Sequence, residues 1–502
     1  MQIKVDANAA TDLQADIKVF GVFQTVEKKG KVTERYYDES SIKDSYVRKE
    51  LKNIALASTF DASLGSLFSF NCSQGGTYLL MGLGEKKNLT REQLRRNIAK
   101  LLSYKNKVTS LAVDASSFFL GNTEDSIVAM YEGLMLANYD FQKYKSNPKT
   151  PKLKTITLSV PKKNHALFAQ IQKKTTILAQ SVNFSRDLVN EVPNVLHSEK
   201  YAQIIAEDAR KNLKGVKVKI LNKAQVKAEK MNLFLSVNAG SAYEPRFVHL
   251  SYTPSKAAKK AKHIALVGKG ITFDTGGYSL KPAANMTSMK YDMAGSATVY
   301  AAFRTAVLNK CPHKLTCLMA ITDNAVNENA TVPDAVVTSR RGKTVEILNT
   351  DAEGRLILAD ALDYACDLKP DVILDAATLT GAVLVALGDE VCGIMSNNDK
   401  LVKDLLTSAK ESDEYLWQLP LIDEYRDAIK SKVADLKNIG KPMKAGTAIG
   451  GVFLEEFIKD GIAWAHFDIA GVAHDQAHLP YCPSQGASGL MVRTMVNYIF
   501  NE

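Results

Sequence analysis

Acidic and basic side chains gather in two glycine-flanked segments of this 502-residue chain. The first is VGKGITFDTGG at 267–277, and the second is NTDAEGR at 349–355. Four carboxylates in one crevice would repel one another strongly unless cations lay between them. Two divalent ions about 3.5–4 Å apart, sharing carboxylate bridges and a water, would remove that repulsion. The carboxylates in and near these segments are Asp274, Asp292, Asp351 and Glu353.

Other interpretations of these segments have to be weighed. The spacing of Gly268-Lys269-Gly270 matches neither GxGxxG nor GxxxxGK[ST], which disfavours a phosphate-binding loop. A single Asp is more often a helix cap or a surface residue than a ligand, and Asp292 could simply cap a helix over 293–308. Spacing alone therefore leaves both a metal hydrolase and a set of structural roles open.

The elements around these segments predict an α/β fold. Strand-like runs alternate with Ala-rich helical stretches, which is the pattern of a sheet covered by helices on both faces. Loops at the carboxyl ends of the strands in such a sheet converge on a crevice, and both acidic segments follow predicted sheet elements. The predicted strands are 216–221, 247–252, 263–267, 315–321, 372–376 and 463–467.

Length and composition predict two domains. A single core stops growing at roughly 250–300 residues, and this chain is longer. Residues 166–189 carry apolar positions at helical spacing, and Pro193 disfavours helix at Val192. We therefore expect a smaller N-terminal α/β domain at 1–165, a linker helix at 166–190, and a larger C-terminal catalytic α/β domain at 191–502 with a central mixed sheet flanked by helices.

The remaining composition indicates a soluble cytoplasmic protein. No stretch approaches the roughly 20 apolar residues of a membrane-spanning helix, and the N-terminus lacks the pattern of a secretory signal. The six cysteines are scattered, as expected for reduced thiols. The net charge of +10 raises the alternative of DNA binding, but no aromatic residues interleave with the lysine runs, which favours a solvated basic surface.

Both segments resemble the signatures of the leucyl aminopeptidase (cytosol aminopeptidase) family. NTDAEGR is intact, and VGKGITFDTGG is followed by KYDM at 290–293, although Thr275 stands where many relatives have Ser. The resemblance extends to 190–194, 240–242, 375–381 and 463–471, and so spans the C-terminal domain.

This resemblance implies a dinuclear metallopeptidase, a hydrolase that removes residues from the free N-termini of peptides. The implied metals are zinc or manganese, with magnesium as a further alternative, and Asp274 and Glu353 would bridge them. Lys269 would have to be neutral to coordinate through its nitrogen. The implied ligands are Lys269, Asp274, Asp292, Asp351 and Glu353.

The same resemblance implies two catalytic residues that are not ligands. Lys281 would hydrogen-bond the scissile carbonyl oxygen as charge develops. Arg355 would hold a bicarbonate ion that serves as general base toward the bridging water. This agrees with the absence of His from both motifs and of HExxH from the chain. A different two-metal hydrolase, such as an amidase or phosphoesterase, is a weaker alternative.

The resemblance also implies a pocket for the first substrate residue and a homohexamer. The pocket would be mostly apolar and suit Leu or Met, while Ala473 replaces a methionine of some relatives and would widen it. We expect His466 and His474 to have structural roles, and Cys311-Pro312-His313 to form a turn. The implied pocket positions are Met289, Thr378, Gly381, Ala470 and Ala473.

Overall fold

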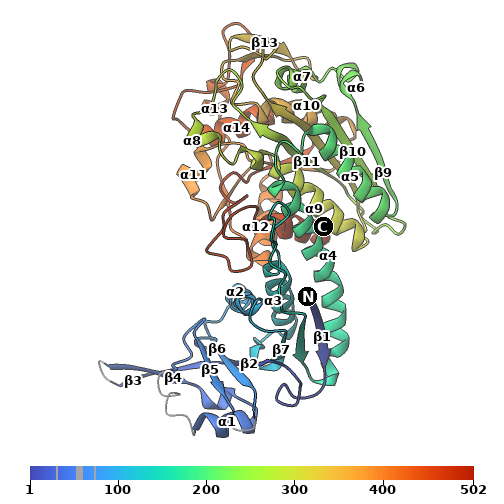
Figure 1. Cartoon of the computed structure of the whole chain (residues 1–502). Coiled ribbons are helices and arrows are strands. Elements are labelled where there is room, and N and C mark those ends of the chain that lie inside the picture. Colours follow the sequence, from blue (N-terminus) through green and yellow to red (C-terminus); the bar gives the residue numbers. More distant parts are fainter. Residues whose placement is uncertain (30–31, 53–59, 73–74) are drawn as a thin grey trace. The chain divides into compact units, whose positions relative to one another are not determined.

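The computed structural model describes residues 1–29, 32–52, 60–72 and 75–502, which fold into two compact units (Figure 1). One unit comprises Met1–Ala179 and Ala477–Ser484, and the other comprises Gln180–Gln476 and Gln485–Glu502. The division falls within helix α4 (His165–Asn190), whose sequence contains neither Gly nor Pro. Helix α4 ends shortly before Pro193, where the ring of the proline disfavours helical backbone.

The first unit is built on a six-stranded sheet in the order β1-β8-β7-β2-β6-β5. Its strands pair in parallel except for β5, which runs antiparallel to β6. Strand β6 is apolar and almost wholly buried, as expected for an inner strand. The elements are β1 (Gln2–Asp6), β2 (Ile17–Val22), β3 (Gln24–Lys29), β4 (Val32–Tyr37), α1 (Ser45–Lys52), β5 (Leu67–Asn71), β6 (Thr77–Gly82), α2 (Arg91–Ala99), β7 (Ser110–Asp114), α3 (Thr123–Ala137) and β8 (Thr155–Ser159).

The second unit contains an eight-stranded mixed sheet in the order β17-β16-β19-β15-β11-β12-β10-β9. The four central strands β19, β15, β11 and β12 are parallel, whereas β10 and β16 join them antiparallel. This confirms the predicted α/β class with a central mixed sheet. The strands are β9 (Val216–Leu221), β10 (Arg246–Tyr252), β11 (His263–Asp274), β12 (Lys314–Asn324), β15 (Val372–Ala377), β16 (Cys392–Ser396), β17 (Leu416–Gln418) and β19 (Ala463–Asp468).

Helices cover both faces of this sheet (Figure 1). On one face α5 (Ser198–Asn212) packs beside α9 (Ala294–Leu308), where the Tyr300 hydroxyl donates to Asp208 Oδ2 at 2.5 Å. On the other face, the buried side of α10 (Gly354–Asp367) belongs to a large apolar cluster. The remaining elements are α6 (Lys223–Ala228), α7 (Asn232–Asn238), α8 (Ala283–Met286), β13 (Ala335–Thr338), β14 (Thr344–Ile347), α11 (Ala382–Leu387), α12 (Asp399–Ser412), α13 (Asp423–Ala428), β18 (Leu436–Lys437), α14 (Gly446–Glu455) and α15 (Val492–Asn501).

Strand β11 is longer than the sequence pattern predicts, because it continues through two glycines to Asp274. A Cβ on Gly268 would lie 2.4 Å from the Cα of Ser296, and one on Gly270 would lie 2.7 Å from the carbonyl oxygen of Ala320. These glycines permit close packing within the strand and do not end it. As a result, Asp274 lies at the carboxyl end of a central strand.

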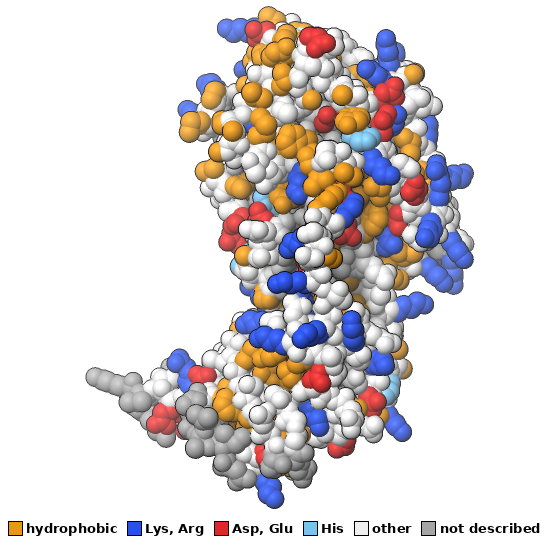
Figure 2. Space-filling model, in the orientation of Figure 1, with side chains coloured by type: hydrophobic (Ala, Val, Ile, Leu, Met, Phe, Trp, Pro, Cys, Tyr) orange, Lys and Arg blue, Asp and Glu red, His pale blue; other side chains and the backbone are white. Residues whose placement is uncertain are grey.

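On the face drawn in Figure 2, Lys and Arg side chains are spread over both units, with Asp and Glu among them.

Within the residues that the structure describes, no helix has both the length and the apolar character needed to cross a membrane.

Candidate metal centre

The first group of predicted site residues surrounds Lys269 on β11. Its Nζ lies 2.8 Å from Asp292 Oδ1 and 2.8 Å from Glu353 Oε1. It also donates to the carbonyl oxygen of Thr378 at 2.8 Å, and the Thr378 hydroxyl donates to Asp292 Oδ1 at 2.7 Å. All three charged side chains are buried. Residues from β11, the segment 289–293, the 349–355 loop and the end of β15 therefore meet at one point.

The second group surrounds Lys281. Its Nζ lies 2.8 Å from Asp274 Oδ2 and forms an ion pair with Asp351 Oδ1. Asp274, Asp351 and Glu353 each place one carboxylate oxygen within 4.8 Å of the others. Glu353 thus belongs to both groups, and the two lysines lie among one continuous set of four carboxylates.

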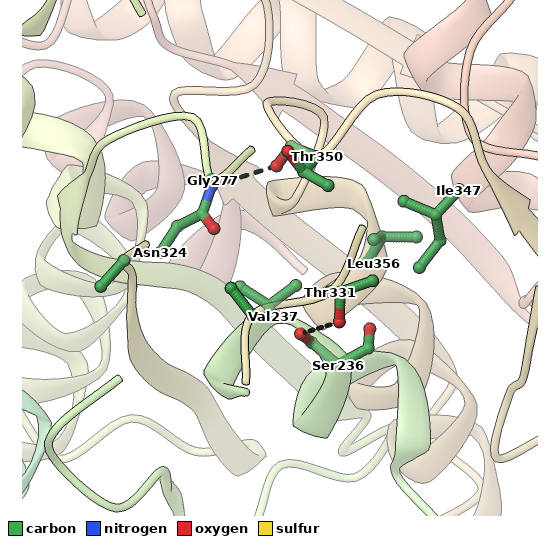
Figure 3. A pocket seen from close by; sticks show the side chains of 10 residues that line it. Ser236, Val237, Gly277, Asn324, Thr331, Ile347, Thr350 and Leu356 are labelled. Atoms are coloured by element: carbon green, nitrogen blue, oxygen red, sulfur yellow. Dashed lines mark hydrogen bonds between the residues drawn. The ribbon is translucent and has the colours of Figure 1, made fainter. Parts of the chain in front are cut away.

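Two hydrogen bonds hold the Oδ1 atom of the Asp274 carboxylate. Its Oδ1 accepts the backbone N–H of Gly276 at 2.9 Å and the side-chain amide of Asn324 at 2.8 Å. Asn324 also donates to the carbonyl oxygen of Thr350 at 3.0 Å, as Figure 3 shows. Asn324 ends β12, and spacing gave no signal for it, since it stands about 50 residues from Asp274.

Gly277 lets the first acidic segment approach the second. Its φ of +64° lies in the left-handed region, and a Cβ there would lie 2.8 Å from Thr350 Oγ1. Beneath this contact is a small cavity of about 10 Å³, lined on one side by Gly277, Asn324 and Thr350 (Figure 3). A side chain at 277 would separate the two acidic segments.

Asp292 does not act as a helix cap. It lies inside a short 3-10 helix, Met289–Met293, and α9 begins after Met293 without a side-chain cap. Its Oδ1 faces Lys269 and Thr378, while its Oδ2 is buried and has no hydrogen-bond partner among the described residues. A capping role therefore does not explain the burial of Asp292.

The donor set fits a divalent cation. Glu353 Oε2, like Asp292 Oδ2, is buried without a hydrogen-bond partner in the described part of the chain. Burial, together with Glu353 and Asp274, raises the pKa of Asp292 well above its usual value, although Lys269 opposes this. Burial, with Asp274 and Glu353, likewise raises the pKa of Asp351. Bound cations would relieve this repulsion, and carboxylate oxygens are suitable ligands for them.

The neighbouring carboxylates favour the charged form of both lysines. Burial by itself would lower the pKa of Lys269, but Asp292, Glu353 and Asp274 raise this pKa above its ordinary value. In the same way, Asp274 and Asp351 outweigh burial and raise the pKa of Lys281. A role for Lys269 as a nitrogen ligand would require the loss of its proton, which neighbouring cations would favour.

Arg355 lies beside the cluster at the start of α10. It is buried, its Nη1 donates to the carbonyl oxygen of Asn438 at 2.8 Å, and its Nε has no hydrogen-bond partner among the described residues. Burial lowers the pKa of Arg355 to about 10, although Glu353 and Asp468 oppose this. In the described part of the chain no carboxylate bonds directly to the Arg355 guanidinium, and a buried guanidinium of this kind suits a small anion.

The predicted pocket residues lie on three segments. Met289 begins the 3-10 helix that contains Asp292, Thr378 and Gly381 follow β15, and Ala470 and Ala473 follow β19. A Cβ on Gly381 would meet no atom within 4 Å, whereas Ala473 is buried.

The histidines and the Cys-Pro-His segment have structural contacts. His466 is buried with its Nδ1 2.5 Å from Asp375 Oδ1, and His474 Nδ1 lies 3.0 Å from Asp475 Oδ2. His313 accepts the backbone N–H of Lys262 at 3.1 Å in the turn between α9 and β12. These contacts agree with the structural roles predicted for them.

Comparison with known proteins identifies the family of this chain. The catalytic-domain model of the cytosol aminopeptidase family matches residues 183–496, and its N-terminal-domain model matches 19–148. The "Probable cytosol aminopeptidase" of Persephonella marina is 39% identical over 450 residues, covering 88% of this chain and 89% of that protein. The "Cytosol aminopeptidase" of Pseudomonas aeruginosa is 41% identical over 435 residues, covering 84% and 85%.

A solved structure extends the similarity to both units. The bottromycin maturation enzyme BotP in complex with Mn has a TM-score of 0.83 at 28% identity, covering 97% of this chain and 99% of that one. The family models, these relatives and the carboxylate cluster all indicate a metal-dependent peptidase. The chain belongs to the cytosol aminopeptidase family and is a metal-dependent aminopeptidase that acts on peptides.

Proposed function

We propose that this chain binds two divalent metal ions, with Asp274 and Glu353 bridging them. The observation that carries this proposal is the convergence of four buried or half-buried carboxylates. Two of them, Asp292 and Glu353, keep a buried oxygen that has neither a hydrogen-bond partner nor an ion pair among the described residues. The metals would polarise the scissile carbonyl and activate a water. The manganese complex of BotP supports Mn²⁺, and Zn²⁺ or Mg²⁺ would suit the same donors. The proposed ligands are Lys269, Asp274, Asp292, Asp351 and Glu353.

We propose a preference for Leu or Met as the first residue of the substrate. Four of the five pocket positions have an apolar side chain or none. At the fifth, Thr378, the hydroxyl donates to Asp292 Oδ1. Such a pocket offers no partner for a charged side chain. A free α-amine would lie next to the carboxylate cluster, which restricts cleavage to N-terminal residues.

The substrate proposal is tested with p-nitroanilides of Leu, Met, Lys and Asp, each with a free or an N-acetylated amine. We expect kcat/KM for Leu and Met to exceed that for Asp by at least about 10²-fold, because burying an unpaired charge is costly. Acetylated substrates should not be cleaved. Equal rates for Leu and Asp would reject the apolar pocket, and cleavage of acetylated substrates would reject the requirement for a free amine.

We propose that Arg355 holds a small anion, bicarbonate, that serves as the general base. The motifs at 267–277 and 349–355 contain no His, so neither offers an imidazole for this task. The Arg355 Nε is a buried donor without a hydrogen-bond partner among the described residues, beside Glu353. A single bicarbonate could accept from this donor and still present an oxygen to a proton.

Arg355→Ala should abolish the response of the enzyme to added bicarbonate and lower kcat by about 10²-fold, the typical contribution of a general base. Metal content should be unchanged, since no ligand is removed. Arg426→Ala is the control, because it removes an arginine that pairs with Glu455. A wild-type enzyme whose rate does not depend on bicarbonate, and does not change in the variant, would exclude this base.

The family resemblance also supports a homohexamer, and the word "cytosol" in the names of the relatives supports a cytoplasmic location. Light scattering on the purified protein checks the first point. A mass six times that of one chain is expected, whereas a monomeric mass would contradict it.

A further inference from the structure

Asp468 is a fully buried carboxylate at the carboxyl end of β19. Its Oδ1 accepts backbone N–H groups from Leu379 at 3.1 Å, Thr380 at 3.4 Å and Ala470 at 3.3 Å. Its Oδ2 accepts the hydroxyl of Thr380 at 2.7 Å. One side chain therefore joins the segment that follows β15 to the segment that follows β19.

The segment after β15 also contacts two of the proposed metal ligands. The carbonyl oxygen of Thr378 accepts from Lys269 Nζ, and the Thr378 hydroxyl donates to Asp292 Oδ1. Leu379, the next residue, is bonded to Asp468. Thr378 is thus held between the metal cluster on one side and the Asp468 carboxylate on the other.

The same two segments carry four of the five proposed pocket residues. Thr378 and Gly381 belong to the first segment, and Ala470 and Ala473 belong to the second. Strands β15 and β19 pair in the sheet as far as Ala377 and Asp468, and the backbone N–H of Ile469 donates to the carbonyl oxygen of Ala377 at 2.9 Å. Beyond this last pair, the side-chain hydrogen bonds of Asp468 connect the two segments.

We propose that Asp468 is a positioning residue for the peptidase reaction: it fixes the segments 378–381 and 470–473 relative to each other, and so places Thr378 against Lys269 and Asp292 and sets the shape of the pocket. The inference rests on the ligand set and pocket proposed above. It adds a residue that touches neither metal nor substrate but acts on both through Thr378.

The acceptor geometry of Asp468 is what this role requires. Without it, three backbone N–H groups and the Thr380 hydroxyl would lose a buried acceptor, which is costly and would loosen both segments. The Thr380 hydroxyl also lies 3.0 Å from the Thr447 hydroxyl at the start of α14, so the network extends to a third element. Fully connected buried networks of this kind are rigid.

An asparagine can supply most of the same contacts. Its oxygen can accept the three N–H groups, and its NH₂ can donate to the Thr380 hydroxyl. Asp468→Asn should therefore restore what Asp468→Ala loses, which a role that depended on the negative charge would not allow.

Asp360 offers a matched structural control. It is also fully buried and accepts two backbone N–H groups from separate segments, Phe234 at 3.0 Å and Arg340 at 2.8 Å. Neither segment contains a proposed ligand or pocket residue. Asp360→Ala should lower the melting temperature without changing the metal affinity or the KM.

The test measures KM and kcat for Leu-p-nitroanilide, and the Mn²⁺ dissociation constant by chelator competition, well below the melting temperature of each variant. We expect Asp468→Ala to raise both KM and the Mn²⁺ dissociation constant by about 10-fold, the lower end of the effect of an outer-shell partner. Asp468→Asn should lie within about threefold of wild type, since it keeps the acceptor. An Asp468→Ala variant that loses only thermal stability, as Asp360→Ala does, would overturn the proposal.

Two further variants keep the test decisive. If Asp468→Ala does not fold, Thr380→Ala removes one of the four contacts and should shift both constants in the same direction, and wild-type constants would count against the role. Glu353→Ala distinguishes failure of the proposed ligand set from failure of the positioning role. If it keeps wild-type metal affinity, the ligand set has failed; if it loses metal while Asp468→Ala is unchanged, only the positioning role has failed.

Discussion

Glu353→Ala is expected to lose its bound divalent metal, and its kcat/KM should fall by at least about a thousandfold. This exceeds the roughly 10–100-fold loss that follows removal of a residue that only hydrogen-bonds to a metal ligand. Glu353 is the residue that joins the two groups of the site. Its Oε1 contacts Lys269, and it belongs to the carboxylate cluster with Asp274 and Asp351. As the proposed bridge, it would be shared by both ions, so that its removal weakens two sites at once.

Metal analysis after dialysis, together with kcat/KM, checks this expectation. Glu353→Gln keeps the size of the side chain but not its charge, and should lose metal as well, because an amide is a poor bridging ligand. Glu455→Ala is the control for removal of a glutamate, since Glu455 at the end of α14 pairs with Arg426 of α13 and neither is a proposed ligand or pocket residue. A Glu353→Ala protein with wild-type metal content and activity would remove Glu353 from the ligand set.

Lys281→Ala is expected to keep its metal and to lose about 10²–10³-fold in kcat, the range measured for one oxyanion-stabilising donor. Lys281 Nζ lies 2.8 Å from Asp274 Oδ2 and pairs with Asp351, which places it at the carboxylate cluster, and these two carboxylates raise its pKa. It is not required as a ligand, and bound cations would compensate the charge of both carboxylates. Removal of the Lys281 side chain should therefore lower kcat and leave the metal content unchanged.

Steady-state kinetics and metal analysis on the same samples separate the two effects. Lys281→Arg should recover part of the lost kcat, because it restores a positive donor with a different geometry. Lys343→Ala, which breaks a partly exposed pair with Glu456, is the control for loss of a lysine. Unchanged kcat in Lys281→Ala would exclude the oxyanion role, and loss of metal would show that Lys281 instead supports the ligands.

The sequence pattern predicted the class of the fold and the strands that carry the site. Alternation of strand-like and Ala-rich stretches was sufficient, because buried parallel strands form nearly continuous apolar runs. The end of β11 could not be predicted, since Gly268 and Gly270 normally signal a turn and here allow close contact with Ser296 and Ala320. The short strands β13, β14, β16, β17 and β18 also escaped prediction, because two to five residues carry little periodicity.

The candidate site was predictable where its residues share a motif. Asp351 and Glu353 stand two positions apart, and Asp274 follows a predicted strand, so both segments could be recognised as candidate metal-binding segments. Lys269 came only from the family resemblance, because a lysine in isolation suggests a surface residue. Asn324 and Asp468 act on the site from segments that only the fold brings together, and no spacing in the sequence indicates them.

The most direct test of the dinuclear centre is a titration of metal-free protein with Mn²⁺, in which bound metal and hydrolysis of Leu-p-nitroanilide are followed together. Two tightly bound ions per chain are expected, with activity that appears as they bind and is absent from the metal-free protein. Binding of fewer than two ions at full activity, or activity that survives complete removal of metal, would contradict this expectation.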